Sequence, residues 1–119
     1  IGALGFCMGG QLALFAACQN PRIAAAVDFY GSIPGLPLEL GSCRAALLAI
    51  FAERDAYIPP AQVDALRIEL RRAGLRASVR VEPGGGHAFM NESRPDVHDA
   101  AAAAKGWSAL LAFLRAELN

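Results

Sequence analysis

Three side chains in this sequence are of the types that act together in acyl-transfer chemistry: Cys7, Asp55 and His87. A thiolate can attack a carbonyl carbon, and an imidazole can move protons to and from the nucleophile and the leaving group. A carboxylate can hold the imidazole in one tautomer. The three can work as one unit only if the elements between them bring them to one place.

The cysteine stands in a turn bracketed by glycines, Gly5-Phe6-Cys7-Met8-Gly9, between an apolar run and a run of helix formers. This pattern matches the strand–turn–helix nucleophile elbow, with Cys in place of Ser. We expect a side chain at Gly5 or Gly9 to collide with backbone where the chain doubles back. The turn is predicted to expose the thiol at a helix N-terminus, and the Met8 N–H to be an oxyanion-hole donor.

Each of the three residues also has a structural interpretation. A free cysteine is most often a small buried hydrophobe, Asp55 can cap a turn before a helix, and His87 can be an exposed loop residue. All three, however, follow separate apolar runs in the order of the α/β-hydrolase triad, and this agreement favours catalysis. The second histidine, His98, is predicted to lie on an exposed helix face beside Asp96 and Asp99.

The composition is that of a core-rich globular domain. The chain has 119 residues, of which 55% are hydrophobic, and 11 basic side chains balance 11 acidic ones. We expect one domain spanning residues 1–119 and no disordered segment. The absence of a basic excess argues against a nucleic-acid partner, and no apolar run reaches the roughly 18 residues of a membrane span.

The cysteines Cys7, Cys18 and Cys43 are odd in number and form no C-x-x-C pair. A disulfide framework or a metal site is therefore not expected, and a reducing, cytoplasmic location is. Structural roles are predicted for Cys18 and Cys43. The sequence starts without Met, inside a predicted strand, so we expect the N-terminal half of the domain to be missing.

Apolar runs of strand length alternate with helix-forming segments along the chain. The predicted strands are 1–6, 23–30, 45–51 and 76–82, the predicted helices are 10–18, 61–73 and 96–118, and 32–44 is a loop. This alternation predicts an α/β fold with a mainly parallel sheet and flanking helices. The last helix is expected to bury Trp107, Leu110, Leu111 and Leu114. The three chemistry-bearing residues would then meet at the carboxyl edge of the sheet, where such folds place their ligand sites.

Four segments resemble the dienelactone hydrolase family, whose members are also called carboxymethylenebutenolidases. They are residues 5–10 (GFCMGG), 28–31 (DFYG), 53–59 (ERDAYIP) and 85–91 (GGHAFMN). The resemblance covers essentially the whole chain and is to the C-terminal half of such a protein. It implies an α/β-hydrolase fold and a Cys-His-Asp triad that opens an enol-lactone or related small ester without metal or cofactor. Cys7, His87 and Asp55 would fill the three roles, with Tyr30 near the site.

The sequence departs from the family pattern at the substrate pocket. Members acting on dienelactone are expected to hold its carboxylate with arginines, one of them four residues after the catalytic histidine. Asn91 occupies that position, and Arg94 is the substrate-binding candidate that remains. An acidic residue and a second oxyanion donor would belong to the missing half. A thioesterase or general carboxylesterase on the same scaffold is therefore an alternative, and so is a truncated, non-catalytic fragment.

Overall fold

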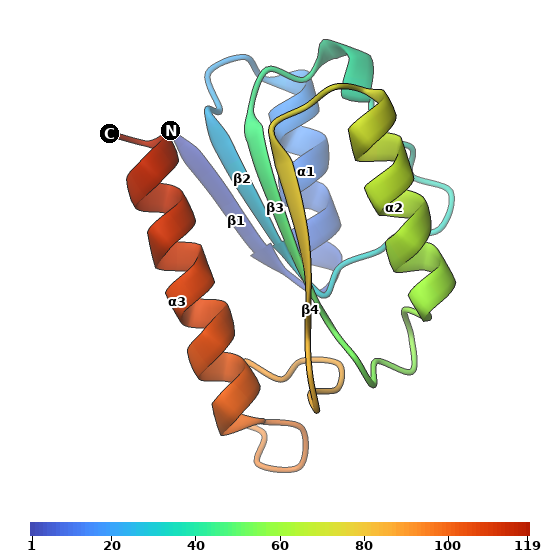
Figure 1. Ribbon diagram of the computed structural model, residues 1–119, viewed down its shortest axis with the longest axis vertical. Helices are drawn as coiled ribbons and strands as arrows, with labels where there is room; N and C mark the ends of the chain where they lie inside the picture. Colours follow the sequence, from blue (N-terminus) through green and yellow to red (C-terminus); the bar gives the residue numbers. More distant parts are fainter.

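The strands form one parallel sheet in the order in which they occur in the sequence. The computed structural model describes residues 1–119. Each strand pairs in parallel with the next (Figure 1), the four being β1 (Gly2–Phe6), β2 (Ala25–Phe29), β3 (Ala46–Ala52) and β4 (Ala77–Glu82). The parallel α/β sheet predicted from the sequence is confirmed.

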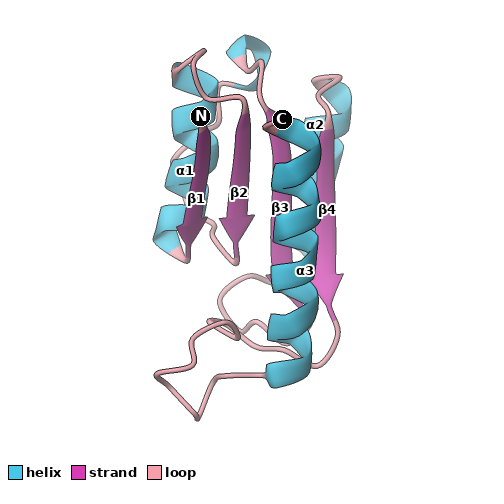
Figure 2. Cartoon of the chain, turned by 90° about the vertical axis from the view of Figure 1, so that its left-hand side faces the viewer, coloured by secondary structure: helices cyan, strands magenta, loops and turns pink.

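Helices cover both faces of this sheet. Helices α1 (Met8–Gln19) and α2 (Pro60–Arg72) lie on one face, and α3 (Ala100–Glu117) lies on the other (Figure 1). Figure 2 shows α3 running along the sheet and the loops that follow the strands gathered at one end. The predicted loop between β2 and β3 holds one short 3-10 helix, η1 (Leu40–Ser42). None of the helices combines the length and the hydropathy needed to cross a membrane.

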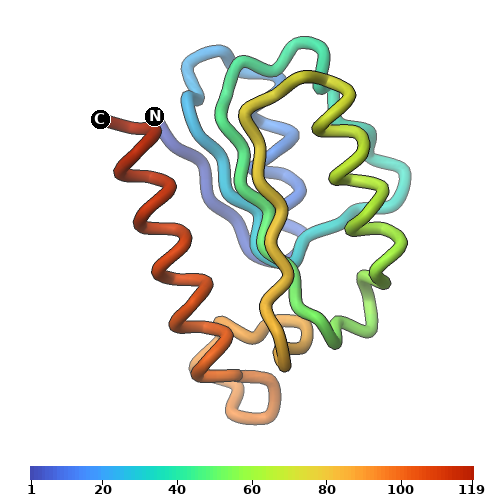
Figure 3. The backbone as a smooth tube through the Cα atoms, in the orientation of Figure 1, coloured from blue at the N-terminus to red at the C-terminus, as the bar shows by residue number.

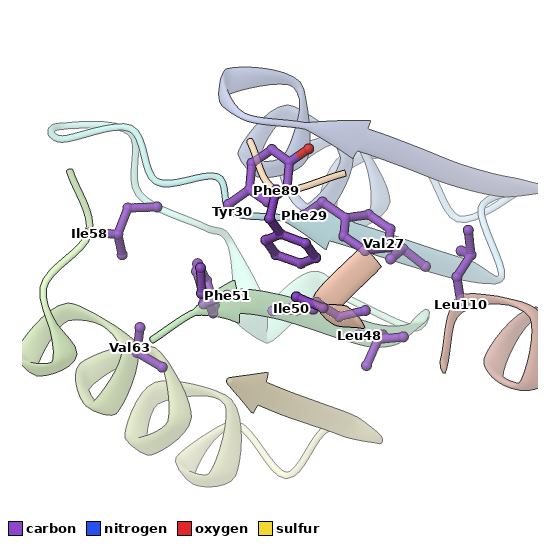
Figure 4. Close-up of a cluster of buried hydrophobic side chains, with 13 residues drawn as sticks. Val27, Phe29, Tyr30, Leu48, Ile50, Phe51, Ile58, Val63, Phe89 and Leu110 are labelled. Carbon is purple, nitrogen blue, oxygen red and sulfur yellow. The ribbon is translucent and has the colours of Figure 1, made fainter. Parts of the chain in front are cut away.

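The two central strands are buried on both faces, as parallel strands covered by helices must be. Every residue of β2 and β3 is buried, whereas β4, at the sheet edge, alternates between partly buried and exposed positions over residues 77–80 and is buried only at Glu82. One cluster of buried side chains, drawn in Figure 4, includes Phe29, Phe51 and Phe89. Burying each of these rings stabilises the fold by about 1.5–3 kcal/mol.

The last helix begins later than predicted, at residue 100 rather than 96. Asp99 is its N-cap, and the Asp99 side chain accepts a hydrogen bond from the Ala102 N–H at 2.9 Å. The preceding residues form turns, in which the N–H groups of Val97 and His98 both donate to the Arg94 carbonyl. Alanine is not a residue type that marks the start of a helix, so the N-cap Asp99 determines where α3 begins.

The buried face of α3 also differs from the predicted stripe. Leu110 is buried as expected, but Trp107 is 51% exposed. Gly106 lies on the face of α3 that packs against the sheet. A methyl group on Gly106 would lie 3.1 Å from the Phe29 ring and 3.4 Å from the Phe89 ring. The helix therefore approaches the sheet closely at a residue that has no side chain.

Strand β1 forms one edge of the sheet, with β2 as its only partner. Two large apolar side chains on this strand, Leu4 and Phe6, are exposed by 44% and 43%. The outer N–H and C=O groups of a flat apolar edge are a template for pairing with another chain. In Figure 3 the end of the chain after α3 lies beside the start of β1, where the Leu118 side chain reaches Gly2.

The isolated 119-residue chain is expected to self-associate through β1, because pairing covers its free backbone groups and its apolar side chains. Leu4→Lys should shift the chain toward the monomer in size-exclusion chromatography, since a charge on an edge strand opposes pairing. Ile68→Lys, on the exposed face of α2, is the matched control and should change nothing. Equal elution of both variants and the unmodified chain would contradict an association through β1.

Candidate active site

Three turns at the carboxyl edge of the sheet bring Cys7, His87 and Asp55 into contact. Cys7 follows β1, Asp55 follows β3 and His87 follows β4. The Sγ atom of Cys7 lies 3.0 Å from Nε2 of His87, and Nδ1 of His87 lies 2.8 Å from Oδ2 of Asp55. Thiol, imidazole and carboxyl groups thus form one connected chain, the arrangement that an activated nucleophile requires.

The turn that carries Cys7 has an unusual backbone and is tightly bonded. Cys7 is exposed and has φ 57° and ψ −130°, a conformation that side chains rarely adopt. Its N–H donates to the Phe29 carbonyl at 2.8 Å, and its own carbonyl accepts from the Gly10 N–H at 2.9 Å. These two bonds fix the thiol at the N-terminus of α1.

The glycines of this turn have unequal roles. A methyl group on Gly5 would lie 1.9 Å from the Gly9 carbonyl oxygen, so only glycine permits this approach of β1 to α1. At Gly9, by contrast, no atom lies within 4 Å of the position of such a methyl group. The expected collision is therefore found at Gly5, and the expectation for Gly9 was wrong.

The backbone N–H of Met8 is available beside the thiol. Helix α1 begins at Met8, so this N–H has no carbonyl one turn earlier in the helix. It also donates none of the backbone hydrogen bonds formed outside the regular elements. A free donor on the residue after the nucleophile is what an oxyanion hole uses.

Asp55 combines the two interpretations that the sequence left open. Its side chain is fully buried, and its Oδ1 accepts a hydrogen bond from the Tyr57 N–H at 2.8 Å. Its Oδ2 faces His87. One oxygen thus caps the turn after β3 while the other orients the imidazole, so both oxygens of this buried carboxyl group are paired.

Hydrogen bonds join the turn that holds Asp55 to the loop that holds His87. The Arg54 N–H donates to the Gly85 carbonyl at 2.9 Å. The Glu53 carboxylate accepts from the Gly84 N–H at 2.9 Å. These bonds cross between the ends of β3 and β4, so the acid and the histidine are held by one connected stretch of backbone.

The His87 ring packs against two tyrosine rings. The ring centroid of Tyr30 is 5.3 Å away and that of Tyr57 is 5.0 Å away, both in edge-on geometry, which is a favourable aromatic arrangement. Tyr30 is buried, and burial raises its pKa to about 12, so its phenol stays neutral. Tyr57 is 76% exposed. It was not predicted as a site residue, although its position two residues after Asp55 could have indicated that it lies near the site.

Backbone strain is concentrated at this site. The three non-glycine residues with positive φ are Cys7, Tyr30 and Ala88, with φ of 57°, 45° and 65°. All three line the same cleft. Such conformations cost about 1–3 kcal/mol each and are kept where the surrounding structure enforces them, most often at functional sites.

An open cleft of about 790 Å³ surrounds the thiol and the imidazole. Its wall includes the apolar side chains of Met8 and Ile58, and its polar lining includes Arg94, Asp96 and His98. The Arg94 guanidinium is paired with Asp96 at 2.9 Å. His98 lies in the turn before α3 and is half-buried, which corrects its predicted place on an exposed helix face.

No group of three or more His, Cys, Asp or Glu side chains is arranged to hold a metal ion.

The model of the dienelactone hydrolase family matches residues 1–118. The chain belongs to this family. A provisionally named carboxymethylenebutenolidase from Escherichia coli is 34% identical over 93% of this chain, which corresponds to 44% of that protein. Protein usf from Aquifex pyrophilus is 32% identical over 100% of this chain and 52% of its own length.

Solved structures agree with this assignment. A provisionally named dienelactone hydrolase from Klebsiella pneumoniae superposes with a TM-score of 0.87 at 31% identity, covering 93% of this chain and 50% of that one. The α/β-hydrolase fold expected for a dienelactone hydrolase family member is thereby confirmed. The chain spans about half the length of the relatives that it matches.

The other two cysteines of this family member are buried away from the cleft. Cys18 and Cys43 lie in the cluster beneath α1 and α2. Burial, and secondly the neighbouring Cys43, raises the pKa of the Cys18 thiol to about 12. The Cys43 thiol points at the Ala45 carbonyl at 3.8 Å. Their predicted structural role is consistent with this burial.

Gly5→Ala is expected to lower the free energy of unfolding by about 3 kcal/mol or more, because the clash is with backbone that cannot move aside. Gly9→Ala is the matched control and should change it by less than about 1 kcal/mol, since alanine is the better helix former. Urea unfolding of the full-length protein measures both. Similar losses for the two variants would show that the close approach of β1 to α1 is not required.

Iodoacetamide near pH 7 is expected to alkylate Cys7 well before Cys18 or Cys43. Only Cys7 is exposed, whereas the Cys18 thiol, with its raised pKa, carries almost no thiolate at that pH. Peptide mapping after limited labelling gives the order directly. Faster labelling of either buried cysteine would remove Cys7 from consideration as the reactive thiol.

Proposed function

We propose that the protein containing this chain hydrolyses an enol-lactone or a related small carboxylic ester, with Cys7 as the nucleophile. The observation that carries the proposal is the unbroken contact from the Cys7 thiol through His87 to the buried Asp55. The membership in the dienelactone hydrolase family and the names of the relatives support the same class of reaction.

In the first half of the reaction, His87 Nε2 takes the proton of the Cys7 thiol as Sγ attacks the carbonyl carbon. The negative charge that develops on the carbonyl oxygen is stabilised by the Met8 N–H. When the tetrahedral intermediate collapses, the carbon–oxygen bond of the ester breaks and His87 gives its proton to the leaving oxygen. In a lactone, the leaving oxygen stays attached to the acyl group that Cys7 holds.

In the second half, His87 takes a proton from a water molecule that attacks the thioester carbon. The second tetrahedral intermediate releases the carboxylic acid and returns the thiol. Asp55 Oδ2 keeps the proton of His87 on Nδ1, so Nε2 is free to accept and donate in each half. The reaction balances with water alone and needs no cofactor.

The cleft supports a small-molecule substrate. Tyr30 and Tyr57 form an aromatic wall beside the imidazole, and this wall suits a planar unsaturated ring. Arg94 is the proposed contact for a carboxylate on the substrate, in exchange with Asp96. A cytoplasmic location remains part of the proposal, since the three cysteines are unpaired thiols.

His87→Ala in the full-length protein is expected to lower kcat by roughly 10³-fold or more, because a triad works as a unit. His98→Ala removes the other histidine of the cleft and should stay within a few-fold of wild type. Hydrolysis of p-nitrophenyl acetate and of a five-membered enol-lactone, followed side by side, measures both. Wild-type turnover in His87→Ala, or an equal loss in His98→Ala, would refute the proposed mechanism.

A further inference from the structure

A carboxyl group that the proposed mechanism does not use lies directly beneath the turn of Cys7. Asp28 is on β2 and is fully buried. Its partners in the sheet register are Gly5 on β1 and Ala49 on β3. Burying a carboxyl group inside an apolar sheet is costly unless the group is held by hydrogen bonds, so its presence there calls for a function.

One oxygen of Asp28 is wedged between two glycines. Its Oδ1 accepts a hydrogen bond from the Gly31 N–H at 2.7 Å. A methyl group on Gly10, in the first turn of α1, would lie only 1.9 Å from this oxygen. A methyl group on Gly31 would lie 2.6 Å from the same oxygen and 2.2 Å from the Cys7 carbonyl oxygen. The carboxyl group therefore sets the spacing between the first turn of α1 and the turn after β2.

The turn of residues 28–31, which the Asp28 side chain closes, contacts both Cys7 and the imidazole of His87. The Phe29 carbonyl accepts from the Cys7 N–H at 2.8 Å. Tyr30, with φ 45°, places its ring against His87. The bond from Gly31 to Asp28 spans these two residues and holds the strained turn closed. A loosened turn would move Cys7 and His87 independently of each other.

The second oxygen of Asp28 indicates the protonation state of the group. Its Oδ2 is buried and has no hydrogen-bond partner. Burial raises the pKa of Asp28 well above its usual range, and the bond from Gly31 offsets this only partly. Gly5, Gly10 and Ala49, which face it from β1, α1 and β3, do not titrate, and Cys7 is the titratable residue of the adjoining turn.

We propose that Asp28, as an uncharged acid, is a positioning residue that aims Cys7 at His87 by locking the turn after β2 against the first turn of α1. An uncharged acid group still accepts the hydrogen bond from the Gly31 N–H, and it places no negative charge beneath the attacking sulfur. The inference rests on the proposed function of Cys7 as the nucleophile.

Two substitutions at Asp28 separate its hydrogen bonds from its volume. In the full-length protein, Asp28→Asn keeps an acceptor and a donor and should retain most of the wild-type kcat. Asp28→Leu fills the space without an acceptor and should lower kcat and the rate of Cys7 alkylation by roughly 10- to 100-fold, with little change in KM. Leu70→Ala, in the buried cluster beneath α2, is the control for a general loss of stability.

The outcomes distinguish the two proposals. If Cys7 is reactive in the wild-type protein and Asp28→Leu keeps the wild-type kcat and alkylation rate, the positioning role alone is overturned. The same holds if Leu70→Ala lowers kcat as much as Asp28→Leu does. Wild-type Cys7 that is no more reactive than Cys18 or Cys43 would overturn the proposed function and this inference with it. If Asp28→Leu does not fold, Asp28→Ala replaces it, with the same expected losses.

The pH dependence of the free energy of unfolding tests whether Asp28 is uncharged in the native protein. An aspartate of the unfolded chain loses its proton near pH 3.9, whereas native Asp28 keeps its proton at higher pH, so the native state binds more protons. Wild-type stability should therefore fall relative to Asp28→Asn as the pH rises from about 4 toward 8. Urea unfolding at several pH values measures the difference. A difference that does not change with pH would show that Asp28 is ionised in the native protein and would overturn the inference.

Discussion

The contact between Gly5 and Gly9 is the constraint on which the arrangement of this site depends. Strand β1 meets helix α1 so closely that a single methyl group has no space between them. The chain must then reverse within the residues between the two glycines, which forces Cys7 to a positive φ and leaves its side chain exposed. A looser turn would release this strain and would also turn the thiol away from the cleft.

The parallel sheet converts this local constraint into a site. Because all four strands run in the same direction, the turns after β1, β3 and β4 end at one edge. The aromatic rings beside His87 and the bonds between residues 53–54 and 84–85 then remove the remaining freedom of the loops. Rigid elements fix where each side chain starts, and short-range polar contacts fix where it points.

Apolar periodicity located the strands well, because burial between two helical layers requires continuous runs such as residues 46–52. The motifs around Cys7, Asp55 and His87 were sufficient to place these residues at one edge. Contacts between distant residues were not visible in the sequence. The close approach at Gly106 and the open space beside Gly9 depend on neighbours far along the chain. A polar residue inside a strand, such as Asp28, gives no sign of whether it will face solvent or a helix.

The separation of the two reacting groups along the chain also has a consequence for biosynthesis. Cys7 and His87 are 80 residues apart, and Phe89, beside the histidine, is buried and lies close to Gly106 of α3. A chain that emerges from the ribosome in sequence order thus presents its thiol long before any proton carrier can reach it. An incomplete chain that ends before residue 87 thus contains the thiol without the histidine that would activate it.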